Sequence, residues 1–229
     1  MIHVRPSEER GRNKIDWLDT HFTFSFDQYF DPEHIQFRSL RVLNEDVVAP
    51  GKGFGMHPHK DMEILTWILD GALEHRDSMG TGAVIRPGEL QHMTAGSGVL
   101  HSEFNPSPKD ATHLLQIWIV PDKKNLKPEY EQLAFPDQDL RGKFHHVAGP
   151  EAPVTIHQDA DLFIARLDKN EETNHEIKPG RHAWVQVARG NVRLNDLELK
   201  QGDGAAISKE KEIRVVAQEP SEVLLFDLA

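Results

Sequence analysis

Two pairs of side chains in this sequence have the types and the spacing of metal ligands. His57 and His59 are two residues apart, and so are His101 and Glu103. On a β-strand, residues two apart point to the same face, so each pair can direct both side chains into one cavity. Three imidazoles and one carboxylate suit Fe, Ni, Cu, Mn or Zn, and they leave coordination positions open for other molecules.

Spacing alone is weak evidence, because histidine is abundant in this chain. With 14 histidines among 229 residues, chance alone produces roughly one His-x-His pair. The absence of cysteine is more decisive. It excludes disulfides, thiolate zinc sites, iron–sulfur clusters and cysteine nucleophiles, so any metal must be held by nitrogen and oxygen.

The elements that would position these ligands are short β-rich runs separated by Gly, Pro and Asp turns. Leu194 to Leu197 is expected to form a tight hairpin, since Asn195 and Asp196 tolerate the positive φ of such turns. Helix signals are few, and the best predicts a short helix near Pro128 to Leu133. Many evenly spaced strands predict an all-β, antiparallel sandwich or barrel. The predicted strands cover residues 37–48, 63–69, 84–85, 114–120, 162–167, 183–187, 191–194, 212–216 and 222–226.

The chain is long enough for two small β domains. A stretch rich in Pro, Lys, Asp and Gly between Pro121 and Pro150 is the expected linker. It predicts an N-terminal domain over residues 1–135 that carries the metal site, and a C-terminal domain over residues 140–229. A faint internal repeat, in which the turn at Asp70-Gly71 is echoed at Arg189-Gly190, suggests that the two halves are related.

Charge and hydropathy argue against nucleic-acid-binding and membrane-spanning proteins. The net charge of −11 repels phosphate, which argues against direct nucleic-acid binding. Residues 1–17 are polar and show no signal peptide, and no apolar run is long enough to cross a bilayer. A soluble, intracellular protein is therefore expected, and the cytoplasm is its expected location.

The sequence around the two ligand pairs resembles the two cupin motifs, and more closely the sequences of the pirin family of bicupins. The first pair lies in Gly53-Phe54-Gly55-Met56-His57-Pro58-His59 and the second follows Met93-Thr94-Ala95-Gly96-Ser97-Gly98. The resemblance spans almost the whole chain. Other matching segments are Trp17-Leu18-Asp19, Phe24-Ser25-Phe26, Tyr29-Phe30-Asp31-Pro32, Gln116-Ile117-Trp118, Tyr130-Glu131-Gln132 and His157-Gln158-Asp159.

This resemblance implies two cupin-type antiparallel β-barrel or jelly-roll domains with few short helices. It also implies that His57, His59, His101 and Glu103 are the ligands of one divalent transition metal. Iron is the first expectation, with Ni, Co, Cu, Mn or Zn as alternatives. Glu63, a ligand in ordinary cupins, is expected to have a supporting or structural role. The second half has Arg181 and His182 where a first motif would stand, so it is expected to bind no metal.

Bacterial members of this kind resemble quercetin 2,3-dioxygenases, which open the central ring of flavonols and release carbon monoxide. By that resemblance the substrates are a flavonol and O2, and Glu103 is both ligand and base for the flavonol 3-hydroxyl. The alternative is a pirin-like regulator that contacts a transcription factor or a metabolic enzyme. A third possibility is a metalloenzyme for an unrelated small molecule. A monomer is expected from the family.

Three other histidines lie near these motifs. His92 and His113 fall close to the expected site, where they would either orient ligands or substrate or form ordinary hydrogen bonds. His75, between Glu74 and Asp77, is expected in a surface hairpin.

Overall fold

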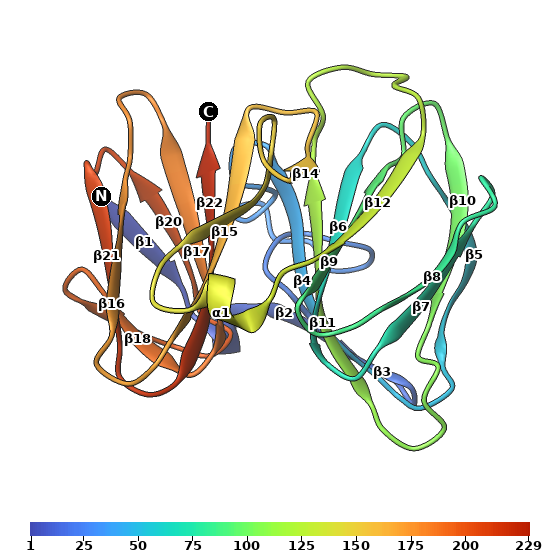
Figure 1. The fold of residues 1–229 in the computed structure, drawn as a ribbon, viewed down its shortest axis with the longest axis horizontal. Coiled ribbons are helices and arrows are strands. Elements are labelled where there is room, and N and C mark those ends of the chain that lie inside the picture. Colours follow the sequence, from blue (N-terminus) through green and yellow to red (C-terminus); the bar gives the residue numbers. More distant parts are fainter. The chain divides into compact units, whose positions relative to one another are not determined.

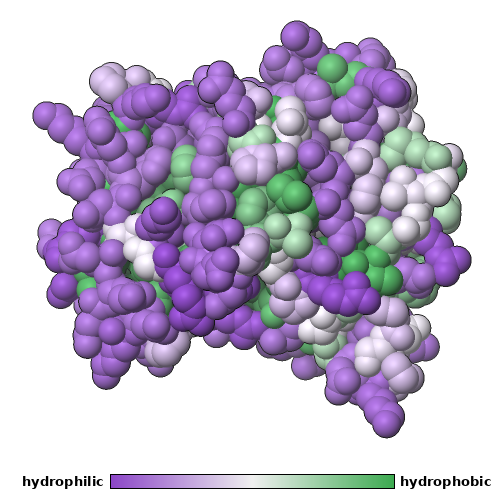
Figure 2. Space-filling model, viewed as in Figure 1, coloured by the Kyte–Doolittle hydropathy of each residue, from purple (hydrophilic) through white to green (hydrophobic).

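The computed structural model describes all residues from Met1 to Ala229, and their regular secondary structure is almost entirely β-strand. The only helices are the 3-10 turn η1 (Ser7–Glu9) and α1 (Asp137–Leu140). Neither helix has the length and apolar character that crossing a membrane requires. The face drawn in Figure 2 is predominantly hydrophilic with small apolar areas between, in keeping with the charged composition. The all-β prediction is confirmed.

The chain folds into two compact units. The first, called here the histidine unit, contains residues 11–134 and 156–158. The second, called the apolar unit, contains residues 1–10, 135–155 and 159–229. The sequence prediction placed residues 1–10 in the N-terminal half, whereas the structure pairs β1 (Ile2–Arg5) with β20 (Gly204–Ser208) of the apolar unit.

The histidine unit has a seven-stranded and a four-stranded sheet (Figure 1). The central strands β6 and β11 of the larger sheet are largely buried, and Ile64, Leu65, Trp67 and Ile68 are all at or near zero exposure. The larger sheet has the order β12 (Glu129–Ala134), β9 (Glu89–Thr94), β6 (Glu63–Asp70), β11 (Thr112–Ile119), β4 (Leu40–Val48), β3 (Leu18–Phe22) and β2 (Gly11–Lys14). The smaller has the order β5 (Gly53–His59), β10 (Val99–Phe104), β7 (Leu73–Asp77) and β8 (Gly82–Ile85).

The apolar unit repeats this arrangement of seven and four strands. Its core is one cluster of buried aliphatic side chains, including Val185, Val215 and Leu225. The larger sheet has the order β1, β20, β17 (His182–Arg189), β22 (Ser221–Leu228), β15 (Ala160–Leu167), β13 (His145–Gly149) and β14 (Val154–Thr155). The smaller has the order β16 (Glu172–Glu176), β21 (Glu212–Ala217), β18 (Asn191–Leu194) and β19 (Leu197–Lys200).

Turn chemistry follows the sequence at several points. Gly71 and Gly190 both have positive φ, 79° and 74°, where the chain turns out of β6 and β17. Glycine adopts such angles without a steric penalty. The predicted hairpin at Leu194 to Leu197 is present between β18 and β19, with Asn195 at φ 50°.

One predicted element is wrong. Residues 128–133 do not form a helix, because Glu129–Ala134 is strand β12 and pairs along its length with β9. Pro128 precedes this strand, and proline is as compatible with the start of an edge strand as with the first turn of a helix. The region between Pro121 and Pro150 is consequently not a plain linker, since it contributes β12, α1 and β13.

Candidate metal centre

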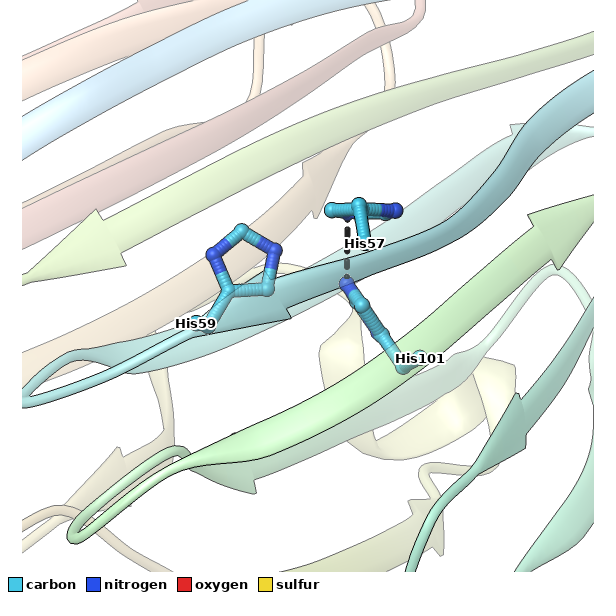
Figure 3. A group of neighbouring side chains, drawn as sticks. All are labelled: His57, His59 and His101. Carbon is cyan, nitrogen blue, oxygen red and sulfur yellow. Dashed lines mark hydrogen bonds between the residues drawn. The ribbon is translucent and has the colours of Figure 1, made fainter.

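The candidate site lies on two neighbouring strands of the histidine unit. His57 and His59 are on β5, and His101 on β10 is directly opposite His57 in the antiparallel register. Figure 3 shows the three rings converging from these two strands. Their ring centroids are 4.4–4.7 Å apart, and one nitrogen from each ring lies within 4.8 Å of the others. The predicted same-face geometry therefore brings all three imidazoles together.

A β-bulge shapes this strand pair. The register shifts between His101 and Glu103, so that Glu103 lies opposite Phe54 rather than opposite Gly55. Gly53 makes the close approach possible, because a Cβ atom there would lie 2.1 Å from the Glu103 carbonyl oxygen. Bulges commonly redirect side chains at functional sites.

The fourth predicted residue, Glu103, is close to His101 but is not part of the three-histidine group. Its carboxylate groups instead with His75 and His101, again within 4.8 Å. Both carboxylate oxygens accept hydrogen bonds from Nε2 of Gln116 at 3.2 Å. Thr66 donates to the amide oxygen of Gln116, which orients the amide NH2 toward Glu103. Glu103 also lines the same cavity as His57 and His59.

Burial governs the protonation of these groups. Burial raises the pKa of Glu103 to about 7, against the opposing effect of its hydrogen bond to Gln116. Burial, with the nearby His57 ring, lowers the pKa of His59 to about 4. Burial and three neighbouring imidazoles hold the pKa of His101 far below its usual range. His59 and His101 are therefore neutral at physiological pH, which is the form that binds metals.

The donor atoms fit a metal ion. Nδ1 of His57 lies 2.7 Å from the carbonyl oxygen of Gly55, an acceptor, so Nδ1 carries the proton and Nε2 has a free lone pair. That Nε2 lies 2.9 Å from Nε2 of His101. Two nitrogen ligands roughly 2.1 Å from one metal and at right angles to each other are about 3.0 Å apart. The observed separation matches this value.

A cavity of about 390 Å³ opens beside the histidines. Its apolar walls are the rings of Trp17, Phe26, Phe54 and Trp118, and the Trp118 ring lies 4.9 Å from the ring of His59. Asn44 and Asp46 add a polar end, where one buried side-chain oxygen of each has no hydrogen-bond partner. Burial raises the pKa of Asp46 to about 6.

Glu63 is buried in a separate polar cluster. Its Oε2 atom accepts hydrogen bonds from Nε2 of His92 at 2.9 Å, from the Thr94 hydroxyl at 3.1 Å and from the backbone N–H of His157 at 3.2 Å. None of these partners is an expected ligand. His113 pairs with Glu45 at 2.9 Å. His92 and His113 thus have the ordinary hydrogen bonds that were one of the two expectations for them.

The expectation for His75 is correct for the hairpin but wrong for its exposure. His75 is on β7, which forms a hairpin with β8, but its side chain is fully buried and lies behind His101. The alternation of charged residues in Glu74-His75-Arg76-Asp77 suggested solvent exposure on both faces. The overlooked signal was the spacing of His75 and Asp77, which are two residues apart, as in the two ligand pairs, and share one face of the strand.

The paired seven- and four-stranded sheets and the histidine cluster define a two-domain cupin. Residues 3–119 match the family model named Pirin, and residues 147–228 match the model for the quercetinase C-terminal cupin domain. The chain therefore belongs to the pirin family, as its motifs predicted.

Similar proteins are found over the full length. A quercetin 2,3-dioxygenase of Escherichia coli K12 is 46% identical, with 100% of this chain and 99% of that protein covered. A putative quercetin 2,3-dioxygenase of Pasteurella multocida is 44% identical, with both chains fully covered. The solved structure of the bacterial pirin YhhW from Escherichia coli in complex with nickel(II) has a TM-score of 0.95 at 45% identity, covering 100% of this chain and 99% of that one.

Proposed function

We propose that this protein is a metal-dependent dioxygenase that opens the heterocyclic ring of flavonols such as quercetin. His57, His59, His101 and Glu103 would hold one divalent transition metal. Support comes from one observation above all, the cavity that Glu103, His57 and His59 share with four aromatic side chains. The names of the full-length relatives agree with this substrate class.

The cavity suits a planar, polyhydroxylated aromatic molecule. Its apolar walls would cover the faces of a fused ring system, as in most small-molecule sites. At the polar end, the side chains of Asn44 and Asp46 would be the polar partners of substrate hydroxyls. A buried acceptor without a partner is costly, so a hydroxyl placed there is favoured over an apolar edge.

Glu103 would act as the base. Burial raises the pKa of Glu103 to about 7 before a metal binds, and a cation held by this carboxylate would lower that pKa, so the role of base is assigned from the position of Glu103 on the wall of the cavity. Its carboxylate would take the proton of the flavonol 3-hydroxyl, while Gln116 holds the carboxylate in position through the two bonds at 3.2 Å. A bound metal supplies Lewis acidity toward the substrate oxygen and a binding position for O2.

The donor set does not choose the metal. Three imidazoles and a carboxylate accept Fe, Ni, Co, Cu, Mn or Zn. Iron stays the first expectation, and the nickel(II) complex of YhhW makes nickel the next metal to load. Metal analysis of protein purified without added metal decides between them.

Quercetin turnover tests the proposal directly. Metal-loaded protein is expected to remove the flavonol absorbance with matching O2 uptake and release of carbon monoxide. Glu103→Gln is expected to abolish turnover, whereas Glu45→Gln, which alters a carboxylate paired with His113, is the matched control and is expected to retain it. Absence of turnover with every one of Fe, Ni, Co, Cu and Mn would refute the proposed activity.

A regulatory role is the second candidate, and one observation favours it. Met56 on β5 and Leu100 and Phe104 on β10 are exposed by 58%, 45% and 38%, on the same strands that carry the histidines. Exposed apolar side chains next to a metal site suit a docking surface that responds to the metal. Failure of turnover, together with a partner that binds only the metal-loaded form, would favour this role.

A further inference from the structure

His75 and Asp77 form a buried chain of polar groups behind His101. Strand β7 pairs with β10 so that Asp77 is opposite His101 and His75 is opposite Glu103. Nδ1 of His101 lies 3.4 Å from Nδ1 of His75, and Nε2 of His75 lies 3.0 Å from Oδ2 of Asp77. The side chains of His75 and Asp77 have no exposed surface. The Tyr130 ring covers His75 at a centroid distance of 4.8 Å.

With a neutral His75 ring, the donors and acceptors of this chain permit one arrangement of protons. An ionised carboxylate only accepts, and Oδ1 of Asp77 already accepts from the backbone N–H groups of Met79 and Thr81 at 2.9 and 3.0 Å. Nε2 of His75 therefore carries a proton. In a neutral ring with its proton on Nε2, Nδ1 has only a lone pair, so Nδ1 of His75 is an acceptor. The proton between the two rings then belongs to Nδ1 of His101.

This proton on Nδ1 of His101 determines the state of its other nitrogen, Nε2, which faces the other proposed ligands. A neutral imidazole with its proton on Nδ1 has its lone pair on Nε2. The Nε2 of His101 faces the Nε2 of His57 at 2.9 Å, and the bond to the Gly55 carbonyl leaves that atom with a lone pair as well. Two lone pairs directed at each other repel, and a cation bound by both removes the repulsion.

We propose that Asp77 and His75 are positioning residues, which fix the tautomer of His101 so that its Nε2 lone pair is always presented to the metal. This inference rests on the proposed ligand set and adds a supporting chain to it. It also explains why the side chains of His75 and Asp77 are completely buried in a charged hairpin. Hydrogen-bonded partners of this kind change metal affinity by roughly 10–100-fold when they are removed.

Asp77→Asn is expected to reverse the direction of the hydrogen bonds from residue 77 to His101, with little change in side-chain shape. Asparagine keeps an oxygen for the N–H groups of Met79 and Thr81, and it places an NH2 group against Nε2 of His75. Nε2 must then accept, which moves the His75 proton to Nδ1 and the His101 proton to Nε2. We expect affinity for Ni²⁺, measured by competition with a chelator, to fall roughly 10–100-fold. We expect ring ¹⁵N shifts of the metal-free protein to show the two tautomers exchanged.

Asp31→Asn is the matched control. Oδ1 of Asp31 also accepts a backbone N–H, from Glu33 at 3.0 Å, and Oδ2 pairs with Nδ1 of His34 at 2.7 Å. The same substitution is thus made at a carboxylate that closes a turn and pairs with a histidine, but that histidine has no hydrogen bond to a proposed ligand. The affinity for Ni²⁺ is expected to be unchanged.

A second pair of variants guards against misfolding. The amide of His75→Gln donates to Asp77 and accepts from Nδ1 of His101, so this variant is expected to keep both the His101 tautomer and the affinity. His75→Leu removes both bonds and is expected to lose affinity as Asp77→Asn does. Equal loss in the Gln and Leu variants would overturn the proposal and make His75 a ligand.

Measurements on the wild-type protein distinguish failure of the tautomer assignment from failure of the proposed metal site. Three results would each overturn the positioning role of Asp77 and His75. They are a His101 proton on Nε2, a His75 protonated on both nitrogens, and an Asp77→Asn variant with unchanged Ni²⁺ affinity. Wild-type protein that shows the expected tautomers but binds none of Fe, Ni, Co, Cu, Mn or Zn would leave the tautomer assignment standing and refute the metal site. Metal binding without quercetin turnover would refute the activity alone.

Discussion

The four-stranded sheets of the two units share a strand order but not a chemistry. The order is β5-β10-β7-β8 in the histidine unit and β16-β21-β18-β19 in the apolar unit. Strands β10 and β21 are therefore counterparts, since each is the second strand of its sheet. β10 buries His101 and Glu103, with exposures of 1% and 3%. β21 buries Ile213, Val215 and Ala217 in an aliphatic core.

The edge strands differ in the same way. β5 directs His57 toward His101, whereas the one histidine of β16, His175, donates from Nε2 to Oδ2 of Asp227 at 2.7 Å and is thereby engaged elsewhere. The comparison teaches that the fold does not determine whether the space between the sheets is polar. A few inward positions on two strands decide between a metal pocket and an apolar core.

The largest effect is expected from His101→Ala. Loss of the central imidazole removes one nitrogen of the 2.9 Å pair with His57, so metal binding should be abolished while the circular dichroism spectrum stays that of a β protein. Metal content per chain, measured after dialysis, checks this. A variant that keeps its full metal content would refute the ligand set and, with it, the contrast between β10 and β21.

The pH dependence of metal affinity should follow Glu103. Because burial raises the pKa of this carboxyl to about 7, the metal-free protein holds a proton there at pH 6, and that proton must leave before the carboxylate binds a cation. Affinity should therefore rise with pH up to about 7, by up to about tenfold per unit, and then level off. His59, with a pKa of about 4, does not titrate in this range.

Titration of Ni²⁺ affinity between pH 5.5 and 8 measures the slope. Glu103→Gln binds more weakly and is expected to lose the contribution of this proton, so its profile should be flatter than that of the wild type. Parallel profiles for the two proteins would show that Glu103 is not a ligand.

Ile213→Ala probes the counterpart strand. The residue is fully buried among aliphatic side chains, so truncation leaves a cavity and should lower the free energy of unfolding by about 2–5 kcal/mol. Chemical denaturation measures this loss. Metal stoichiometry should not change, and a loss of bound metal would show that the two units do not divide the functions as described.

The smallest effect on the metal is expected from Glu63→Gln. The Oε2 atom of Glu63 accepts from His92, Thr94 and His157 and from none of the proposed ligands. The substitution should lower the free energy of unfolding by about 1–3 kcal/mol, because buried donors lose a charged acceptor. The metal content should equal that of the wild type, and a loss like that of His101→Ala would make Glu63 a ligand.

Local patterns were enough to predict part of this structure. His57, His59 and His101 converge because strand residues two apart share a face, and the tight turn at Asn195 follows from the φ that asparagine tolerates. These features depend on a few neighbouring residues. The motifs around them were specific enough to indicate the family as well.

Long-range pairing was beyond sequence reasoning. Residues 129–134 form a strand because they pair with the edge of β9, and nothing in the sequence between Pro128 and Leu133 indicates that pairing. The aromatic walls of the cavity come from Trp17 and Phe26, far in sequence from Trp118. His75 was misplaced because its surroundings are charged, while its burial depends on β10 and Tyr130.

The pairing of β1 with β20 has a consequence for how the protein is made. Val4 lies opposite Ala205, almost at the other end of the chain. At a synthesis rate of roughly 5–20 residues per second, β1 leaves the ribosome roughly 10–40 seconds before its partner strand exists. The histidine unit, complete but for residues 156–158 once residue 134 has emerged, can fold during that interval. Strand β1 is thus translated well before its partner and is among the last strands to be paired.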